Sequence, residues 1–167
     1  MADDREYPAR PIVGVGAVIL DGDRVLLVRR GREPLKGEWS IPGGAVETGE
    51  TLETAIAREV REETGLEIEI GGTVATLERI RLDAKGRARY HYVLIDFVCR
   101  PIGGQAACAS DAEALEWVAI RDLGRYHVAD VTVRVIRQAA DGVASMSTGS
   151  TGSTGARTPR EVDRQTE

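Results

Sequence analysis

The stretch GGAVETGETLETAIAREVREETGLEI, residues 43–68, has the periodicity of an amphipathic helix but carries many glutamates. With Leu52 as the origin and about 100° per residue, Ile56 falls at about +40° around the helix. Glu59 then falls near about −20° and Glu63 near about +20°. These two carboxylates therefore share the core-facing stripe and do not lie on the polar face where a solvated charge run belongs.

Inward-facing carboxylates need a positive partner. Glu59, Glu62 and Glu63 are spaced i, i+3 and i+4, so they would repel one another and lose hydration. Arg58 and Arg61 are expected to point away from the stripe. The pattern therefore predicts a hard divalent cation, Mg²⁺ with Mn²⁺ as a substitute, held by oxygen ligands. Two histidines and no cysteine cluster disfavour zinc.

The helix in this stretch has recognisable ends. Thr48 or Gly49 is the expected start, and Glu50 and Glu53 suit the positive N-terminal end of the helix dipole. Gly65 is the expected C-terminal stop.

The remaining pattern predicts an α/β protein. Strands are expected at residues 11–20, 24–30, 39–41, 66–81 (with a turn at Gly71-Gly72), 89–100 and 117–120, and a second helix at residues 129–140. The strand at 89–100 is apolar on both parities, which a strand needs only when both faces of its sheet are covered. A mixed sheet between helices follows.

Length and composition indicate one domain with a tail. The chain has 167 residues and a net charge of −5. Residues 1–141 are expected to form the domain, and residues 142–167, rich in Ser, Thr and Gly, a disordered tail. The acidic balance argues against a nucleic-acid polymer or an anionic membrane as partner. The chain shows no secretory signal and no membrane-spanning run, so a cytoplasmic location is expected, with Cys99 and Cys108 as reduced, packed thiols.

The glutamate-rich stretch also resembles a known family motif. Gly44, Glu50 and the run REVREETGL at residues 58–66 match the Nudix box, G-x5-E-x7-R-E-U-x-E-E-x-G-U, at every defined position. The flanking segments GEWSIPGG and ALEWVAIRDL are similar to the family too. The resemblance covers roughly residues 10–140.

The resemblance implies a fold, a reaction and a set of site residues. The fold is the family's α/β/α sandwich, and the reaction is hydrolysis of a nucleoside diphosphate linked to another group X. Glu59, Glu62 and Glu63 correspond to the catalytic and Mg²⁺-binding carboxylates, and the carbonyl of Gly43 or Gly44 adds a metal ligand. Arg58, also in the catalytic set, pairs with Glu50 to fix the loop against the helix.

Metal-bound water supplies the nucleophile in such a reaction, and a carboxylate can accept its proton. The base is a box glutamate or an acid of a later acidic turn, for which Asp111, Glu113 and Glu116 are the options. Each of these three is equally well explained as an ordinary solvated charge.

Several residues outside the box acids are options for substrate contact. Trp39 can stack on a base, Arg29 can meet phosphates, and Gly43 and Gly44 can approach the substrate with their backbone. A core or rim position explains Trp39 at least as well, and a single arginine such as Arg29 is more often a surface charge. Tyr90 and Tyr92 are placed to line a ligand cleft, whereas His91 is interpreted as a core residue.

The sequence leaves three alternatives for the function. Chain size and the segment YHYVLIDF resemble the small bacterial ADP-ribose pyrophosphatases, which implies cleavage to AMP and ribose 5-phosphate. The alternative is a nucleoside triphosphate pyrophosphohydrolase of the 8-oxo-dGTP or pool-cleaning type. A non-catalytic ligand-binding module is the third, and the complete set of box acids argues against it. Homodimers are common in the family, so a homodimer is a further expectation.

Overall fold

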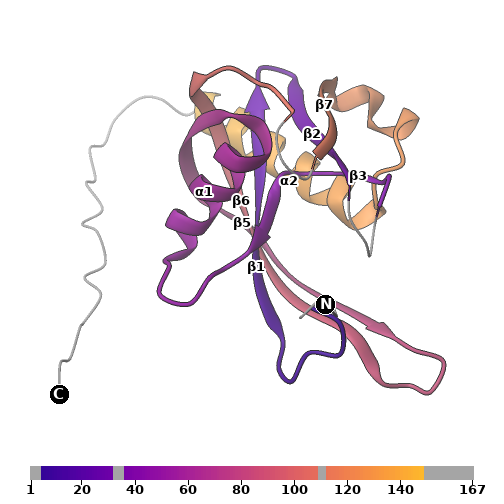
Figure 1. The fold of residues 1–167 in the computed structure, drawn as a ribbon. Helices are drawn as coiled ribbons and strands as arrows, with labels where there is room; N and C mark the ends of the chain where they lie inside the picture. Colours follow the sequence, from indigo (N-terminus) through magenta and orange to yellow (C-terminus); the bar gives the residue numbers. More distant parts are fainter. Residues whose placement is uncertain (1–4, 32–35, 109–111, 149–167) are drawn as a thin grey trace, which may run out of the picture.

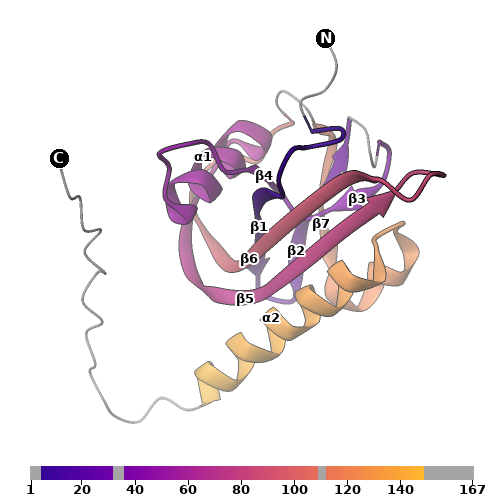
Figure 2. The same ribbon diagram turned by 90° about the horizontal axis from the view of Figure 1, so that it is seen from below.

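A mixed β-sheet lies between two helices (Figures 1 and 2). The computed structural model describes residues 5–31, 36–108 and 112–148. Its strands are β1 Ile12–Asp21, β2 Arg24–Arg30, β3 Trp39–Ser40, β4 Gly43–Ala45, β5 Leu66–Leu82, β6 Ala88–Gly104 and β7 Ala112–Ala119. The helices are α1 Leu52–Thr64 and α2 Asp130–Thr148, with a short 3-10 helix, η1, at Ile120–Arg125. The predicted α/β class with a central mixed sheet is confirmed.

The strand order places the motif beside the centre of the sheet. The order is β3-β2-β1-β6-β5, with β4 paired to β1 and β7 paired to β2. Only β1 and β6 run parallel among the pairings of the described strands. Gly44 of β4 pairs with Val15 of β1. The chain just before α1 is thereby hydrogen-bonded to a central strand.

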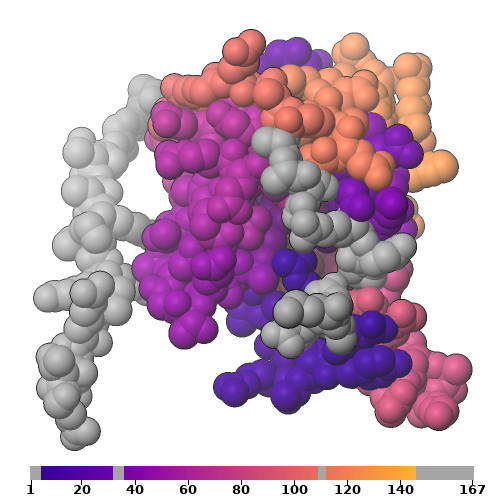
Figure 3. Space-filling model, in the orientation of Figure 1, coloured from indigo at the N-terminus to yellow at the C-terminus, as the bar shows by residue number. Residues whose placement is uncertain are grey.

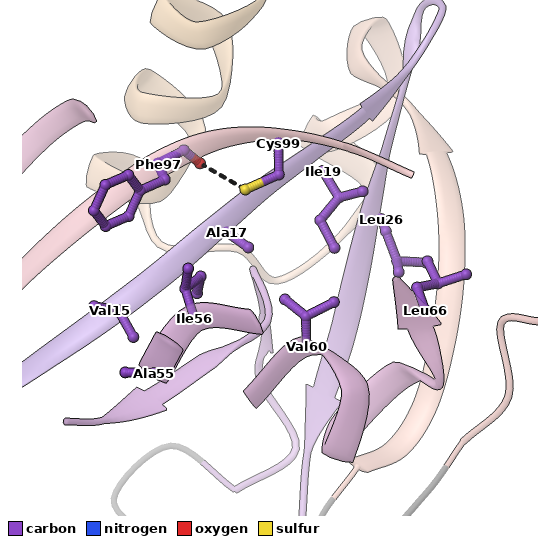
Figure 4. Close-up of a cluster of buried hydrophobic side chains, with 10 residues drawn as sticks. All are labelled: Val15, Ala17, Ile19, Leu26, Ala55, Ile56, Val60, Leu66, Phe97 and Cys99. Carbon is purple, nitrogen blue, oxygen red and sulfur yellow. Dashed lines mark hydrogen bonds between the residues drawn. The ribbon is translucent and has the colours of Figure 1, made fainter. Parts of the chain in front are cut away.

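Strand β1 divides the core by the alternation of its side chains. Val15, Ala17 and Ile19 face α1, where they pack with Ile56 and Val60 (Figure 4). The opposite face of the sheet packs against α2 in a second cluster, which contains Val18, Leu27, Val135 and Ile136. Both faces of the sheet are covered, as the apolar run at residues 89–100 predicted.

Strand β5 differs from the prediction. The expected turn at Gly71-Gly72 is absent, and β5 runs unbroken from Leu66 to Leu82. Its pairing with β6 shifts register between Ile70 and Thr73 instead. The glycines therefore mark an irregularity within one strand, which glycine in a strand often does. The hairpin of β5 and β6 projects from the rest of the molecule (Figures 1 and 3).

Two other boundaries also differ. The acidic turn expected before Trp117 is part of β7, which begins at Ala112. Helix α2 continues to Thr148, so residues 142–148, expected in the tail, are helical. The rest of the expected tail lies outside the described residues. No helix in the described part of the chain is long and apolar enough to span a membrane.

The two cysteines have different surroundings. Cys99 is buried, and its burial raises the pKa of the thiol to about 12. Cys108 is exposed, so the expectation that both thiols are packed is wrong for this one.

Candidate active site

Helix α1 is held at both ends by local capping. It begins after Thr51, whose hydroxyl accepts a hydrogen bond from the Thr54 N–H at 3.1 Å. The start is thus two to three residues beyond the expected Thr48 or Gly49, because Thr51 supplies the side-chain cap. The helix ends at Gly65 with φ +71°, as predicted. These caps fix which way the glutamates of α1 point.

Arg58 ties the loop before α1 to the helix. Its Nε and Nη2 donate to the two carboxylate oxygens of Glu50 at 2.7 and 2.9 Å, a bidentate pair. Nη2 also donates to the carbonyl of Ala45 at 3.2 Å. The Glu50–Arg58 pair implied by the family resemblance is therefore present, and it holds the strand, loop and helix of the motif together.

Arg58 also neutralises acids of the motif. Its Nη1 donates to Glu59 at 2.9 Å and lies 3.4 Å from Glu62. The expectation that Arg58 points away from the stripe was wrong, because the long side chain turns back along the helix toward residues 59 and 62. Part of the positive charge that the buried carboxylates require comes from the protein itself.

The ion pair of Glu50 and Arg58 shifts the pKa values of both groups. The hydrogen bonds from Arg58 lower the pKa of Glu50 to about 2, and the bond to Glu50 raises the pKa of Arg58. Both groups stay charged across the physiological range. The pair acts as fixed scaffolding and not as a proton donor or acceptor.

Glu59 lies against the backbone of β4. A Cβ placed on Gly44 would come within 2.3 Å of the Glu59 carboxyl, so only glycine leaves room for it. The side chain of Glu59 is 15% exposed, and its burial raises the pKa of the carboxyl despite the hydrogen bond from Arg58. The inward placement predicted from helix geometry is confirmed.

Glu63 faces the same backbone one turn later. Its carboxylate accepts a hydrogen bond from the Gly43 N–H at 3.0 Å. Glu62, by contrast, is 55% exposed and lies beside Arg58. Two of the three box acids thus lie together against β4, and the third is at the surface.

Two adjoining cavities open next to these acids. The smaller one, about 70 Å³, is lined by Glu59, Glu63, Arg29 and other residues, and we call it the outer cavity. The larger one, about 440 Å³, is the inner cavity, and its wall includes Tyr90, Tyr92 and Leu94. Four residues line both cavities: Arg5, Arg30, Gly43 and Gly44. A ligand that spans both cavities would pass two arginines and the glycine backbone.

The outer cavity suits a hard cation in its chemistry. It brings two carboxylates and the glycine backbone of β4 to one wall, and oxygen donors of this kind suit Mg²⁺. Among the described residues, no three His, Cys, Asp or Glu side chains are already grouped closely enough to hold a metal ion. Arg58 engages Glu59, so a bound cation would compete with the guanidinium for that carboxylate.

The inner cavity contains charged groups that the sequence reasoning missed. Asp96 of β6 is buried, and Arg79 of β5 donates to the Thr132 hydroxyl at 3.0 Å. Burial raises the pKa of Asp96 to about 6, although the Arg79 charge acts in the opposite direction. A detectable signal was the single acid at the parity of Tyr92, Leu94 and Val98 in an otherwise apolar strand.

The predicted substrate contacts divide. Arg29, Gly43 and Gly44 line the outer cavity, and the two tyrosines line the inner one, as predicted. Trp39 lines neither cavity, because it packs into the α2-side core with its ring centroid 5.6 Å from that of Tyr126.

The residues suggested for a later acidic turn are placed elsewhere. Glu116 lies on β7 and accepts a hydrogen bond from the Tyr126 hydroxyl at 2.5 Å. Glu113, also on β7, lies 3.7 Å from Arg29. Asp111 lies outside the described residues. Neither Glu113 nor Glu116 lines the two cavities, and among the described residues the acids that line the outer cavity are Glu59 and Glu63 of α1.

Comparisons with known proteins agree with the motif. A model of the NUDIX domain matches residues 10–138. The chain is 34% identical over 113 residues to an "ADP-ribose pyrophosphatase" of Methanocaldococcus jannaschii. The matched region covers 68% of this chain and 64% of that protein. It is 38% identical over 116 residues to a "Putative 8-oxo-dGTP diphosphatase 2" of Mycobacterium tuberculosis. That matched region covers 67% of this chain and 75% of the relative. The match therefore spans less than two thirds of the length of the M. jannaschii relative.

The fold agrees as well. The crystal structure of a MutT NUDIX hydrolase from Burkholderia pseudomallei superposes with a TM-score of 0.68 at 32% identity, covering 77% of this chain and 98% of that one. The family model spans most of the chain, and the box occupies the loop and helix around Arg58. The chain belongs to the Nudix hydrolase family.

Proposed function

We propose that the protein is a metal-dependent pyrophosphohydrolase that cleaves a nucleoside diphosphate linked to X, with ADP-ribose as substrate and AMP and ribose 5-phosphate as products. The observation that carries the proposal is the pair of adjoining cavities. One is small and lined by charged side chains of both signs, the other is large and mainly apolar, and Arg5 and Arg30 line the wall that both share. A molecule with a ring at one end and a pyrophosphate in the middle complements this arrangement. The relative named ADP-ribose pyrophosphatase supports this choice of substrate.

The metal assignment follows the oxygen donors of the motif. Glu59 and Glu63, with the backbone of Gly44, would hold Mg²⁺ or Mn²⁺ at the outer cavity, and Glu62 would join them from the surface. Such a cation supplies charge neutralisation of the pyrophosphate and a more acidic bound water.

The chain's own residues then have separate roles. Glu59 and Glu63 are the carboxylates beside the outer cavity, and either can accept the proton of the attacking water. Arg58 keeps the loop of β4 at a fixed distance from these acids through Glu50 and the Ala45 carbonyl. Arg30 lies on the wall that the two cavities share, so its guanidinium provides positive charge beside the proposed position of the pyrophosphate.

A substrate panel tests the proposal. Purified full-length protein is incubated with Mg²⁺ and ADP-ribose, dinucleotides, sugar nucleotides or canonical and oxidised nucleoside triphosphates, and the products are identified. The expected products from ADP-ribose are AMP and ribose 5-phosphate, with no reaction in excess chelator. Undiminished turnover in chelator would refute the metal assignment.

The second candidate is a nucleoside triphosphate pyrophosphohydrolase, which the similarity to the M. tuberculosis protein favours. The same panel separates the two, because this activity releases a nucleoside monophosphate and pyrophosphate. Preferred turnover of an oxidised triphosphate over ADP-ribose would replace the first proposal with the second.

A further inference from the structure

The inner cavity contains two opposite charges that are close but not paired. Asp96 is only 5% exposed, and no described residue hydrogen-bonds to its carboxyl. Arg79 lies near enough for its charge to act on Asp96, yet no ion pair within 4.0 Å joins them in the described part of the chain. The Nε of Arg79 is buried and has no hydrogen-bond partner, although Nη2 is held by Thr132.

Packing fixes this arrangement. Asp96 pairs in register with Gly16 of β1, and a Cβ on Gly16 would lie 2.3 Å from the Asp96 Oδ1. The carboxyl therefore occupies space that exists only because residue 16 is glycine. Arg79 is held from the other side by α2 through Thr132. Both groups line the inner cavity with restricted freedom to move toward each other.

Leaving such groups unmatched is costly. A buried carboxylate and a buried guanidinium N–H each lose hydration, and each needs a hydrogen-bond partner to recover it. A ligand that offers an N–H donor beside an acceptor can pair with the Asp96 carboxyl and with the Arg79 guanidinium where these two side chains line the cavity. An anionic group directly against Asp96 would meet its carboxylate, whereas the rest of the cavity wall also carries Arg5, Arg30, Arg81 and Glu78. The walls supplied by Pro42, Tyr90 and Leu94 suit a flat, mainly apolar ring.

We propose that Asp96 and Arg79 form a recognition pair for a purine base that carries an exocyclic amino group. Asp96 accepts the amino N–H, and the Arg79 guanidinium, which also lines the cavity, donates to a ring nitrogen or carbonyl of the base. The orientation rests on the proposed function, which places the pyrophosphate at the wall shared with the outer cavity. Adenine and guanine both carry such an amino group, whereas hypoxanthine carries none.

Equilibrium binding tests the pair without catalysis. AMP, GMP and IMP are titrated into the full-length, metal-free protein by calorimetry. IMP lacks the amino group and so loses one hydrogen bond to a charged acceptor. Its affinity is expected to be lower than that of the tighter-binding of the other two nucleotides by about tenfold or more. Whether AMP or GMP binds more tightly identifies which purine the cavity takes.

Two substitutions and a control assign the effect. Asp96→Asn is expected to bring the affinities for AMP, GMP and IMP to within about threefold of one another, because the amide no longer provides a charged acceptor. Arg79→Lys retains the charge but lacks the planar guanidinium with its several N–H donors, and it is expected to weaken binding of the preferred nucleotide by about tenfold. Asp141→Asn removes an exposed carboxylate from α2 and should preserve the wild-type order.

The outcomes separate this proposal from the proposed function. Equal affinity of the wild type for the three nucleotides, or no binding of any, overturns the recognition pair. Displacement of AMP by ribose 5-phosphate at similar concentration would assign the cavity to a sugar and also overturn it. Selective binding by a protein that hydrolyses nothing in the panel would refute only the proposed function. Hydrolysis without base selectivity would refute only the recognition pair.

Discussion

The burial of the Asp96 carboxyl predicts how the free energy of unfolding depends on pH. Its folded-state pKa is about 6, raised by burial from an ordinary value of 3.8. Folding therefore favours the protonated form. The stability that the neutral carboxyl provides is complete below about pH 3.8 and is lost as the pH rises through about 6, where the folded protein must bury a charge.

The size of the effect follows from the two pKa values. One pKa unit corresponds to about 1.36 kcal/mol, so the gap between 3.8 and about 6 gives about 3 kcal/mol of destabilisation at about pH 8. At about pH 4 the same expression gives about 0.5 kcal/mol. Asp96→Asn has no carboxyl to ionise. The mutant should therefore gain about 2.5 kcal/mol relative to the wild type between these two pH values.

Urea unfolding of the ligand-free protein, followed by tryptophan fluorescence, measures this difference. The free energies of unfolding of wild type and Asp96→Asn are compared at about pH 4 and about pH 8, with unchanged m-values as the requirement for a two-state comparison. Asp141→Asn, at an exposed position, should show no such pH-dependent gain. An equal stability difference at both pH values would refute the view that Asp96 is desolvated in the folded state.

The remaining predictions concern the motif, the core and the C-terminal segment. Glu63→Gln should lower kcat by about 10²-fold or more while the protein stays folded, because it removes a carboxylate at the outer cavity, as steady-state kinetics and circular dichroism would check. Gly44→Ala should lower metal-dependent activity by about tenfold or more, because the new methyl group displaces the Glu59 carboxyl from which it would lie 2.3 Å away. Ile56→Ala should cost about 2–5 kcal/mol in urea unfolding, because its fully buried side chain fills the α1-side core. Deletion of residues 149–167 should leave kcat/KM within about twofold, because the family match ends at residue 138.

Matched variants control these experiments. Glu53→Gln changes an acid in the first turn of α1 that is exposed, so it should retain activity. Gly72→Ala adds a methyl group where nothing lies within 4 Å, in contrast to Gly44. Full activity of Glu63→Gln, or equal effects of the two glycine substitutions, would contradict the assignment of the outer cavity. A large loss of activity on deletion would show that residues 149–167 contribute to the site.

In the structure, groups of the protein itself neutralise part of the charge of the motif's glutamates, which the argument from charge repulsion did not anticipate. The sequence argument required an external cation because Arg58 was expected to point away. In the structure, Arg58 binds Glu50, Glu59 and Glu62, and the Gly43 N–H serves Glu63. The case for a metal therefore rests on the box pattern, the family and the oxygen donors of the outer cavity, and less on unrelieved repulsion.

Local periodicity and motif spacing by themselves determined the α/β class, the inward direction of Glu59 and Glu63, and the family. These properties depend on the fixed angle between successive residues of a helix and on residue types within one short segment. The scaffold pair of Glu50 and Arg58 could also be inferred, because both partners lie within the motif.

Only the tertiary structure decided which residues surround the ligand cavities. Asp96, Arg79 and Thr132 come from β6, β5 and α2, which are brought together by sheet pairing and by packing of α2 on the sheet. Trp39 was excluded from the cavities for the same kind of reason, since its position depends on contact with Tyr126 far along the chain. Long-range pairing and packing leave no local pattern, so the sequence could place the acids of the motif and suggest the two tyrosines, but it could not bring Asp96, Arg79 and Thr132 to one cavity.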